Sequence, residues 1–278
     1  MTGSRMASQG QKGRVFRALH QRPGAFIIPN PWDAGSARIL EHLGFEALAT
    51  TSAGSAFTKG KRDNALTREE MFQGIAEIAS ATSLPVSADL GNCFGDDSKV
   101  VAETIKLAAA TGIVGGSVED ATGHSDAPIY GFDHAVERVR AAAEAAHSLP
   151  FTFTLTARAE NYLHGRPDLK DTIKRLQAFQ EAGADVLFAP GLPTKEDIAA
   201  VVKSVDRPVN VVMGLNISHL TLAELAELGV KRVSVGGSLC RAALGALLRA
   251  GREMREHGTF TYAAQAASGK ELSDIFEP

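Results

Sequence analysis

Short apolar segments rich in β-branched residues recur along the chain, and longer amphipathic segments separate them. In the longer segments, such as SARILEHLG and SKVVAETIKLAAATG, the apolar residues have helical spacing. The pattern therefore predicts strands that alternate with helices. The predicted strands are AFIIP (25–29), ALATT (47–51), PVSAD (85–89), GGSVE (115–119), FTFTLTA (151–157), DVLFAP (185–190), PVNVVM (208–213) and RVSVGG (232–237).

The predicted strands are almost continuously apolar, which is typical of parallel strands covered by helices on their outer face. Several helices end in a glycine that leads into a strand, as in LGF, TGI, AGAD and LGV. Eight such alternations in one chain predict a single (β/α)₈ barrel of the TIM type. A doubly wound open sheet is the alternative, but no GxGxxG follows the first strand.

The chain shows no linker-like change of composition, so we expect one domain. Residues 1–13 are polar and are expected to form a disordered tail, and residues 14–257 to form the barrel. Residues 258–278 follow the eighth unit and are expected to form an extra helix and a mobile end. This whole tail is expected to pack on another subunit.

Composition narrows the class of protein. The chain has 278 residues, 44% hydrophobic and 22% charged, with a net charge of −3. No basic stripe is dense enough to follow a nucleic-acid backbone, and no apolar run approaches the ~20 residues that span a bilayer. The N-terminus lacks the apolar stretch of a signal peptide, and Cys93 and Cys240 lack CxxC spacing. We therefore expect a cytoplasmic protein with neither nucleic-acid nor membrane partners.

Polar residues gather at the carboxyl ends of the predicted strands, where barrel enzymes carry their reactive groups. Closure of a barrel would bring the carboxylates among them close together, and close carboxylates repel one another unless a cation lies among them. Oxygen ligands favour Mg²⁺, or alternatively Mn²⁺, over zinc. A guanidinium suits forked recognition of a substrate carboxylate or phosphonate. Any single acid also fits a helix cap, but caps do not explain the arginine. The residues are Asn30, Asp89, Glu119, Asp120, Arg158 and Asn210.

At these strand ends the sequence resembles the isocitrate lyase/phosphoenolpyruvate mutase superfamily, from about residue 14 to residue 257. The resemblance lies in PNPWDAGSARILEHLGFEALATTSAG, GKRDNALTREEM, VSADLGNCFGDD, GGSVEDATG, LTARAENYLHG and EAGADVLFAPGL, in this order. It implies a barrel whose last helix is exchanged between subunits of a homodimer or homotetramer. It also implies Mg²⁺ and the cleavage or formation of C–C or P–C bonds in small 2-oxo acids.

The resemblance assigns roles by position. Thr51, Ser52, Ala53 and Gly54 correspond to a loop that holds the 2-oxo acid through backbone amides. Asp89 corresponds to the principal metal-contacting acid, Glu119 to its partner through water, and Asp63 to an acid in the outer shell of the metal. Arg158 corresponds to the clamp on the substrate carboxylate, and Asn210 to a residue lining the same pocket.

The segment after Asp89 departs from the family pattern, D-x-[DE]-x-G-[YF]-G. The second acid is replaced by Gly91 and the following glycine by Cys93. Because Mg²⁺ keeps several waters, Asp89 and Glu119 suffice for a weakened site, and the alternative is that metal and activity are lost. Cys93 is either a nucleophile or a small packed thiol, and its place within a turn favours the packed thiol.

The segment after the fourth strand lacks the KKCGH loop of the lyases and reads EDATGHSDAPIYGFDH. Isocitrate or methylisocitrate cleavage with a cysteine acid is therefore disfavoured. We expect residues 121–134 to form a lid over the site, and His124, beside Ser125, to transfer a proton or orient a water from this lid.

Two other barrel chemistries fit less well. A Schiff-base aldolase needs a desolvated lysine inside the barrel, but Lys231 lies at the opposite end of the eighth strand. The turn Gly236–Ser238 has the form of a phosphate cradle, but the resemblance favours a packing role for it.

The leading hypothesis is therefore a Mg²⁺-dependent lyase that acts on a small carboxylate substrate. It would cleave a C–C bond of a 2-oxo acid or related dicarboxylate by decarboxylation or retro-aldol chemistry, through an enolate. The alternatives are P–C chemistry of the phosphoenolpyruvate mutase and phosphonopyruvate hydrolase type, and an impaired barrel that only binds ligand. The leading hypothesis requires Asp89, Glu119 and Arg158 to meet at one mouth of the barrel.

Overall fold

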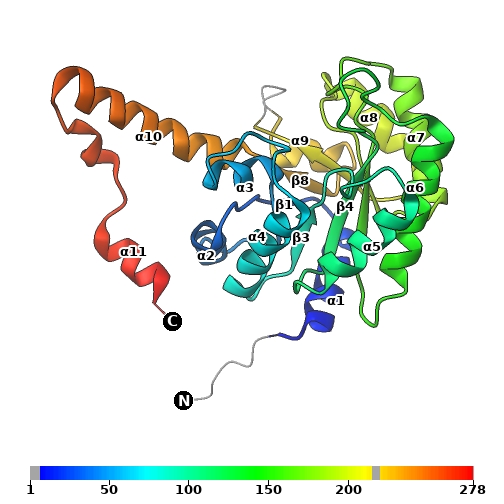
Figure 1. Cartoon of the computed structure of the whole chain (residues 1–278), viewed down its shortest axis with the longest axis horizontal. Coiled ribbons are helices and arrows are strands. Elements are labelled where there is room, and N and C mark those ends of the chain that lie inside the picture. Colours follow the sequence, from blue (N-terminus) through cyan, green and yellow to red (C-terminus); the bar gives the residue numbers. More distant parts are fainter. Residues whose placement is uncertain (1–6, 215–219, 278) are drawn as a thin grey trace.

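The computed structural model describes residues 7–214 and 220–277. Strands and helices alternate along the chain, and the strands form the inner layer while helices cover them from outside (Figure 1). The strands are β1 (Phe26–Ile28), β2 (Leu48–Ala49), β3 (Val86–Asp89), β4 (Gly115–Glu119), β5 (Thr154–Arg158), β6 (Val186–Phe188), β7 (Val209–Val212) and β8 (Arg232–Ser234). The helices are α1 (Gln9–Gln21), α2 (Ala34–His42), α3 (Ser52–Thr58), α4 (Arg68–Ala81), α5 (Ser98–Ala109), α6 (Phe132–His147), α7 (Leu169–Glu181), α8 (Lys195–Lys203), α9 (Leu222–Glu227), α10 (Ser238–His257), the 3₁₀ helix η1 (Thr261–Gln265) and α11 (Gly269–Phe276).

The sheet is parallel throughout, in the order β1-β8-β7-β6-β5-β4-β3-β2. Its two ends approach each other where the Ala49 N–H donates to the Pro29 carbonyl oxygen at 3.0 Å. The sheet is therefore a nearly closed barrel, which confirms the predicted (β/α)₈ fold and removes the open-sheet alternative.

Local sequence explains where the helices begin and end. Asp33, Thr67 and Thr221 each accept the N3 amide in a capping box, which satisfies donors that the first turn leaves free. The predicted C-terminal glycines have left-handed φ angles, for example 99° at Gly112 and 108° at Gly183. A side chain is disfavoured in this conformation, so glycine fixes the entry into the next strand.

Three boundaries differ from the prediction. Helix α1 begins at Gln9, because Ser8 caps it, so ordered structure starts before residue 14 and the predicted tail of residues 1–13 was too long. Strand β5 begins at Thr154 rather than at residue 151. The segment from Ser52, predicted as a loop, is the first turn of α3, and Thr51 is its N-cap.

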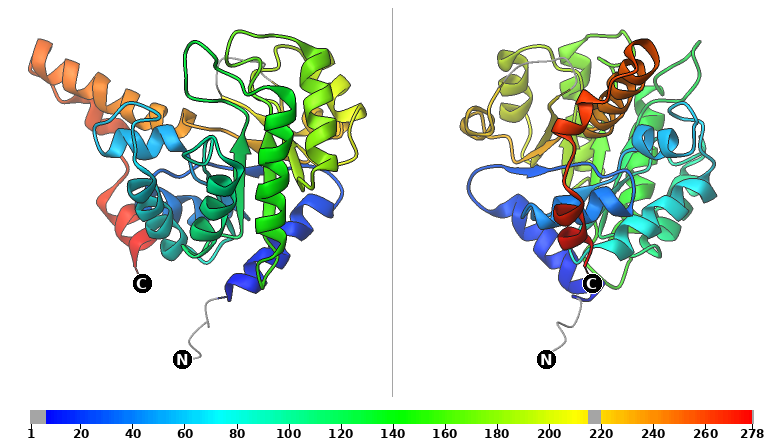
Figure 2. Two further views of the ribbon diagram at one scale, coloured as in Figure 1. Left: turned by 45° about the vertical axis from the view of Figure 1, so that its right-hand side comes forward. Right: turned by 90° about the vertical axis from the view of Figure 1, so that its left-hand side faces the viewer.

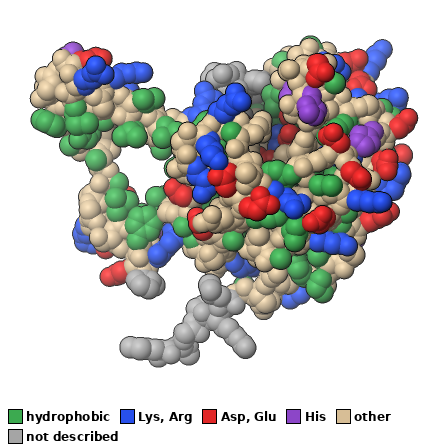
Figure 3. Space-filling view, in the orientation of Figure 1, with side chains coloured by type: hydrophobic (Ala, Val, Ile, Leu, Met, Phe, Trp, Pro, Cys, Tyr) green, Lys and Arg blue, Asp and Glu red, His purple; other side chains and the backbone are tan. Residues whose placement is uncertain are grey.

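The C-terminal region leaves the barrel. Helix α10 projects from β8 as an arm, and the following chain turns back so that α11 lies beside α2 (Figures 1 and 2). Arg38 of α2 donates to the carbonyl oxygens of Ile275, Phe276 and Glu277, which fastens this end. Along the arm, hydrophobic side chains are exposed, and many face the space between arm and barrel (Figure 3). The exposed residues of this helix include Leu244, Leu247, Leu248 and Met254.

No helix in the described part of the chain combines the length and the apolar character needed to cross a membrane. Apolar residues of the helices pack in the wall of the barrel. Val101 and Ile105 of α5 and Val139 of α6, for example, belong to the buried core. This rigid wall holds the strand ends, and with them the polar residues of the barrel mouth.

Candidate active site

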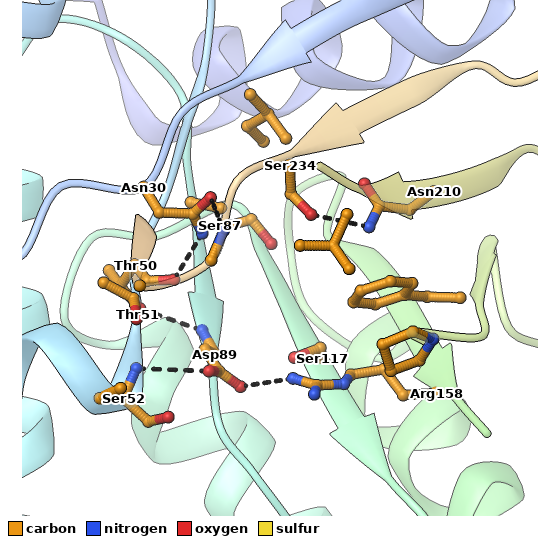
Figure 4. A pocket seen from close by; sticks show the side chains of 18 of the residues that line it. Asn30, Thr50, Thr51, Ser52, Ser87, Asp89, Ser117, Arg158, Asn210 and Ser234 are labelled. Carbon is orange, nitrogen blue, oxygen red and sulfur yellow. Dashed lines mark hydrogen bonds and ion pairs between the residues drawn. The ribbon is translucent and has the colours of Figure 1, made fainter. Parts of the chain in front are cut away.

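A cavity of about 380 Å³ lies inside the barrel at the carboxyl ends of the strands. Its walls carry both polar and apolar side chains from neighbouring strands, and those of Asp89 and Arg158 point toward each other (Figure 4). Seven of the ten residues predicted for the site line it, from different strands and loops, as a barrel mouth requires. They are Thr51, Ser52, Ala53, Asp63, Asp89, Arg158 and Asn210.

Arg158 is the centre of a charged cluster at the mouth. Its Nη1 lies 3.0 Å from Asp89 Oδ1, its Nη2 3.4 Å from Glu119 Oε2, and its Nε 2.8 Å from Glu160 Oε1. The strand register explains the meeting, because Arg158 pairs with Glu119 across β4 and β5. The Arg158 side chain is only 15% exposed, and its guanidinium lies over the Phe188 ring at 5.2 Å. The structure therefore brings Asp89, Glu119 and Arg158 together.

The cluster has more negative than positive charge. Asp89, Glu119 and Glu160 share one guanidinium, so full ionisation leaves a surplus of two negative charges. Burial raises the pKa of Glu119 to about 8, with Arg158 opposing the rise and Glu160 and Asp89 adding to it. A surplus of this size and place favours a divalent cation at the mouth.

Asp120 belongs to a different pair. It is buried, accepts the Glu160 N–H at 2.8 Å and lies 3.0 Å from Arg175 Nη1. This pair fixes the chain after β5 and thereby the Glu160 carboxylate that faces Arg158. Asp120 is therefore structural, although it does not cap a helix.

The carboxylates at the mouth fit a divalent cation, but with fewer protein ligands than a complete metal site has. Among residues 7–214 and 220–277, no group of three or more His, Cys, Asp or Glu side chains is arranged to hold a metal ion. Asp89 and Glu119 offer two carboxylates at one end of Arg158, which suffices for an ion that keeps several waters and is also held by substrate oxygens. The acid missing at Gly91 is expected to weaken this site.

The segment predicted to bind the 2-oxo acid is only partly free to do so. The Ser52 N–H donates to Asp89 Oδ2 at 3.3 Å, which orients that carboxylate. The Gly54 N–H donates to Thr51 Oγ1 at 3.3 Å, and Gly54 does not line the cavity. A substrate-binding role for Gly54 stays a prediction, and it requires the Gly54 amide to leave its capping bond to Thr51.

His124 does not reach the cavity in this conformation. It lies on the exposed loop after β4, where its backbone N–H donates to Thr122 Oγ1 at 2.9 Å. A proton-transfer role for His124 stays a prediction, and it requires residues 121–134 to move toward the mouth. Asn210 lies inside, where its Nδ2 donates to Ser234 Oγ at 3.0 Å (Figure 4).

The modified loop after Asp89 is held by a buried arginine. Gly91, Cys93 and Phe94 have φ angles of 54°, 60° and 63°, a region that disfavours side chains. Arg138, from α6, donates to the carbonyl oxygens of Asn92, Gly95 and Asp96 and so fixes this loop.

Cys93 itself is fully buried, and burial raises the pKa of its thiol to about 12. It is a packed thiol, as the sequence favoured, because thiolate is scarce at neutral pH.

The turn after β8 serves packing. The side-chain oxygen of Asn30 accepts the N–H groups of Val235 and Gly236, both at 2.9 Å. These amides would be needed to cradle a phosphate, so the structure agrees with the packing role predicted for this turn.

Sequence reasoning missed three charged residues of functional weight. Glu160 lies in the segment LTARAENYLHG and was given no role, whereas its 2.8 Å contact is the shortest of the three carboxylate contacts to Arg158. Arg138 lies at a position where helix periodicity predicts an apolar residue, whereas Arg232 shares the polar face of its strand with Ser234, and both arginines are buried. A charge at a periodic apolar position was the available signal for Arg138 alone.

Comparison with known proteins identifies the family and agrees with the fold. The family model of phosphoenolpyruvate phosphomutase matches residues 16–255. Oxaloacetate decarboxylase of Chromohalobacter salexigens is 29% identical over 256 residues, which are 90% of this chain and 87% of the relative. A crystal structure from Burkholderia cenocepacia J2315, provisionally described as a lyase/mutase, is 62% identical, covers 97% of each chain and has a TM-score of 0.95. Phosphonopyruvate hydrolase, solved with oxalate and Mg²⁺, is 26% identical, with a TM-score of 0.84 over 95% of this chain and 94% of that chain.

Proposed function

Because the chain belongs to the phosphoenolpyruvate phosphomutase family, within the superfamily that the sequence resembles, we propose that it is a Mg²⁺-dependent carbon–carbon lyase. Its substrate is a small 2-oxo acid or a related dicarboxylate, cleaved by decarboxylation or retro-aldol chemistry through an enolate. The prediction of a lyase is confirmed at the level of the family and its named relatives.

The observation that carries the proposal is the cluster around Arg158. Three carboxylates meet one guanidinium at the barrel mouth, each within 3.4 Å of a nitrogen of Arg158, beside a cavity of about 380 Å³. A surplus of negative charge holds a divalent cation, and a guanidinium at the same place holds a substrate carboxylate.

Asp89 and Glu119 would hold Mg²⁺, with Mn²⁺ as the alternative ion, and Asp63 would act through water. When bound, the ion polarises the carboxylate and keto oxygens of the substrate and stabilises enolate charge. The chain's own residues do the positioning: Arg158 orients the carboxylate, and the segment Thr51–Ala53 lines the wall beside it. Both cleavage reactions then need one proton donor, and His124 fills this role when residues 121–134 close over the mouth.

Mg²⁺-dependent release of pyruvate or CO₂ from a panel of 2-oxo and 2-hydroxy dicarboxylates tests the proposal. We expect release with at least one member of the panel, and its loss in Asp89→Asn, which keeps the shape of the side chain. Phosphate release from phosphonopyruvate alone would favour P–C chemistry, which ranks second because the 121–131 loop supplies few cationic donors for a phosphonyl group. Tight oxalate binding without any turnover would favour the binding-only barrel.

The exposed apolar face of α10 supports a further part of the proposal, a homodimer or homotetramer. Leu247 and Leu248 are 66% and 57% exposed in the single chain, although both are large aliphatic residues. A second subunit that covers this face would remove them from water. Sedimentation velocity is expected to show an oligomer that dissociates in Leu247→Asp, whereas Arg249→Asp on the same helix serves as the control.

A further inference from the structure

A second arginine lies deep in the same cavity. Arg232 begins β8 and is 5% exposed, and its side chain lines the cavity from below the mouth. Its Nε donates to Asn210 Oδ1 at 2.8 Å and its Nη2 to Thr156 Oγ1 at 3.0 Å. Its Nη1 lies 3.4 Å from Nε2 of His20, a residue of α1. We call these four residues the floor; of them, Arg232 and Asn210 line the cavity, and Thr156 and His20 contact Arg232 from behind it.

The floor holds a positive charge without a counter-charge. All three hydrogen-bond partners of Arg232 are neutral, and no carboxylate in the described part of the chain lies within 4.0 Å of its guanidinium. Burial, and to a lesser extent Arg158, lowers the pKa of Arg232 to about 9, so it remains charged at neutral pH. A buried charge without a partner is costly, and such a charge that faces a cavity is a ready site for an anion.

The spacing of the two arginines suits a ligand with two anionic groups. Thr156, which contacts Arg232, and Arg158 are two residues apart on β5 with their side chains on the same face. Positions so related are about 7 Å apart along the strand, which is roughly the length of a small dicarboxylate. The contact with Thr156 therefore places the Arg232 guanidinium deeper in the barrel than Arg158. The wall between mouth and floor carries the hydroxyl groups of Ser87, Ser117 and Ser234, which can donate to carboxylate oxygens (Figure 4).

We propose that Arg232 binds the second carboxylate of a dicarboxylate substrate whose first carboxylate lies at Arg158. This inference rests on the proposed function and narrows it, because it selects dicarboxylates over monocarboxylic 2-oxo acids. Asn210 is then a positioning residue: its Oδ1 holds the Arg232 Nε, and its Nδ2 is turned to Ser234.

The floor suits a carboxylate better than a phosphonate. It offers one cation and otherwise neutral donors, which balance a single negative charge. A phosphonate carries up to two negative charges and presents three oxygens, so it needs a second cation nearby.

Matched ligand pairs test the inference in calorimetric titrations with Mg²⁺. Malate is compared with 2-hydroxybutyrate, and 2-oxoglutarate with 2-oxopentanoate, because each second ligand carries a methyl group in place of the far carboxylate. Oxalate serves as a ligand for the mouth alone. We expect the wild-type protein to prefer each dicarboxylate at least tenfold. Arg232→Met is expected to lose this preference while its affinity for oxalate changes less than threefold, and Arg232→Lys, which keeps the charge, is expected to retain part of the preference.

The outcomes separate this inference from the function on which it rests. Equal affinities within each pair for the wild-type protein, with oxalate still bound, would overturn the floor site and leave the proposed function standing. An unchanged preference in Arg232→Met would also overturn it. Absence of oxalate binding would overturn the proposed function itself. Tighter binding of 3-phosphonopropionate than of succinate would overturn the assignment of a carboxylate at Arg232 and favour a phosphonate there. The wild-type comparison needs no variant, so it remains decisive if Arg232→Met fails to fold.

Discussion

The charged cluster at the mouth and the floor of the cavity are each centred on one guanidinium, in opposite electrostatic surroundings. At the mouth, Arg158 is surrounded by the carboxylates of Asp89, Glu119 and Glu160. At the floor, Arg232 contacts only neutral groups. Arg158 is therefore outnumbered by the carboxylates around it, whereas Arg232 has no charged contact.

Protonation follows the same contrast. At the mouth, burial raises the pKa of Glu119 to about 8, with Arg158 opposing the rise and Glu160 and Asp89 adding to it, so further negative charge is disfavoured there. At the floor, burial and then Arg232 lower the pKa of His20 to about 3, which shows that further positive charge is unwelcome. The mouth thus accepts a cation and the floor an anion, so a chelating dicarboxylate with its metal would satisfy both ends.

The largest effect is expected from removing the cation at the mouth. In Arg158→Gln, three buried carboxylates lose their partner, so we expect oxalate binding to fall by about 10²–10³-fold. The free energy of unfolding is expected to fall by about 3 kcal/mol without Mg²⁺ and to recover partly when Mg²⁺ is added. Calorimetry and urea denaturation measure the two effects. Arg166→Gln, an exposed arginine after the same strand, is the control, and wild-type oxalate affinity in Arg158→Gln would exclude the clamp role.

The next effect concerns the floor and depends on pH. His20 is held neutral: its Nδ1 lies 2.8 Å from the Phe16 carbonyl oxygen, and its Nε2 faces Arg232. Because its folded pKa of about 3 lies below its unfolded pKa of about 6.5, the unfolded state binds more protons between these values, and stability is lost as the pH falls. From pH 7 to pH 5 this amounts to about 2 kcal/mol.

Urea denaturation of the wild-type protein and His20→Gln at both pH values isolates this contribution. We expect the wild-type stability to fall by about 2 kcal/mol more than that of the variant between pH 7 and pH 5. Equal losses in the two proteins would show that His20 is not held neutral by the floor.

A smaller effect is expected from restoring the acid at position 91. No atom lies within 4 Å of a Cβ built on Gly91, so a side chain has room, and its φ of 54° is one that Asp and Asn tolerate better than other residues. Gly91→Asp places a third carboxylate beside Asp89 and Glu119, so we expect Mg²⁺ to bind about tenfold more tightly, or about 1.4 kcal/mol. Gly91→Asn has the same backbone strain without the charge and is the matched control. Equal Mg²⁺ affinity in the two variants would contradict the placement of the metal.

The mouth could be predicted from the sequence, whereas the floor could not. Strand periodicity fixes which residues end each strand, and closure of a barrel brings all strand ends to one rim, so Asp89, Glu119 and Arg158 had to meet. The role of Arg232 depends on what surrounds it. Its neighbours come from α1, β5 and β7, and nothing in their local sequence shows that they supply no acid.

The structure of short segments without periodicity could not be predicted from the sequence either. TSAGSAFT carries too few apolar residues to mark a helix, so the capping of the Gly54 amide by Thr51 was missed. The loop that carries His124 has no periodic pattern, so its distance from the cavity could not be predicted. Both features concern backbone geometry that depends on contacts distant in the sequence.

The smallest effect is expected on the stability of Arg232→Met, which is compared with that of Arg158→Gln. The variant loses three hydrogen bonds, each worth about 1 kcal/mol, but it also removes a buried charge that has no counter-charge. These terms offset each other, so we expect the free energy of unfolding to change by less than about 1 kcal/mol, against about 3 kcal/mol for Arg158→Gln. Urea denaturation of both variants without ligand measures the contrast. A loss in Arg232→Met as large as that in Arg158→Gln would mean that Arg232 is kept for the fold, whereas near-neutral stability combined with a lost preference for dicarboxylates would mean that it is kept for the ligand.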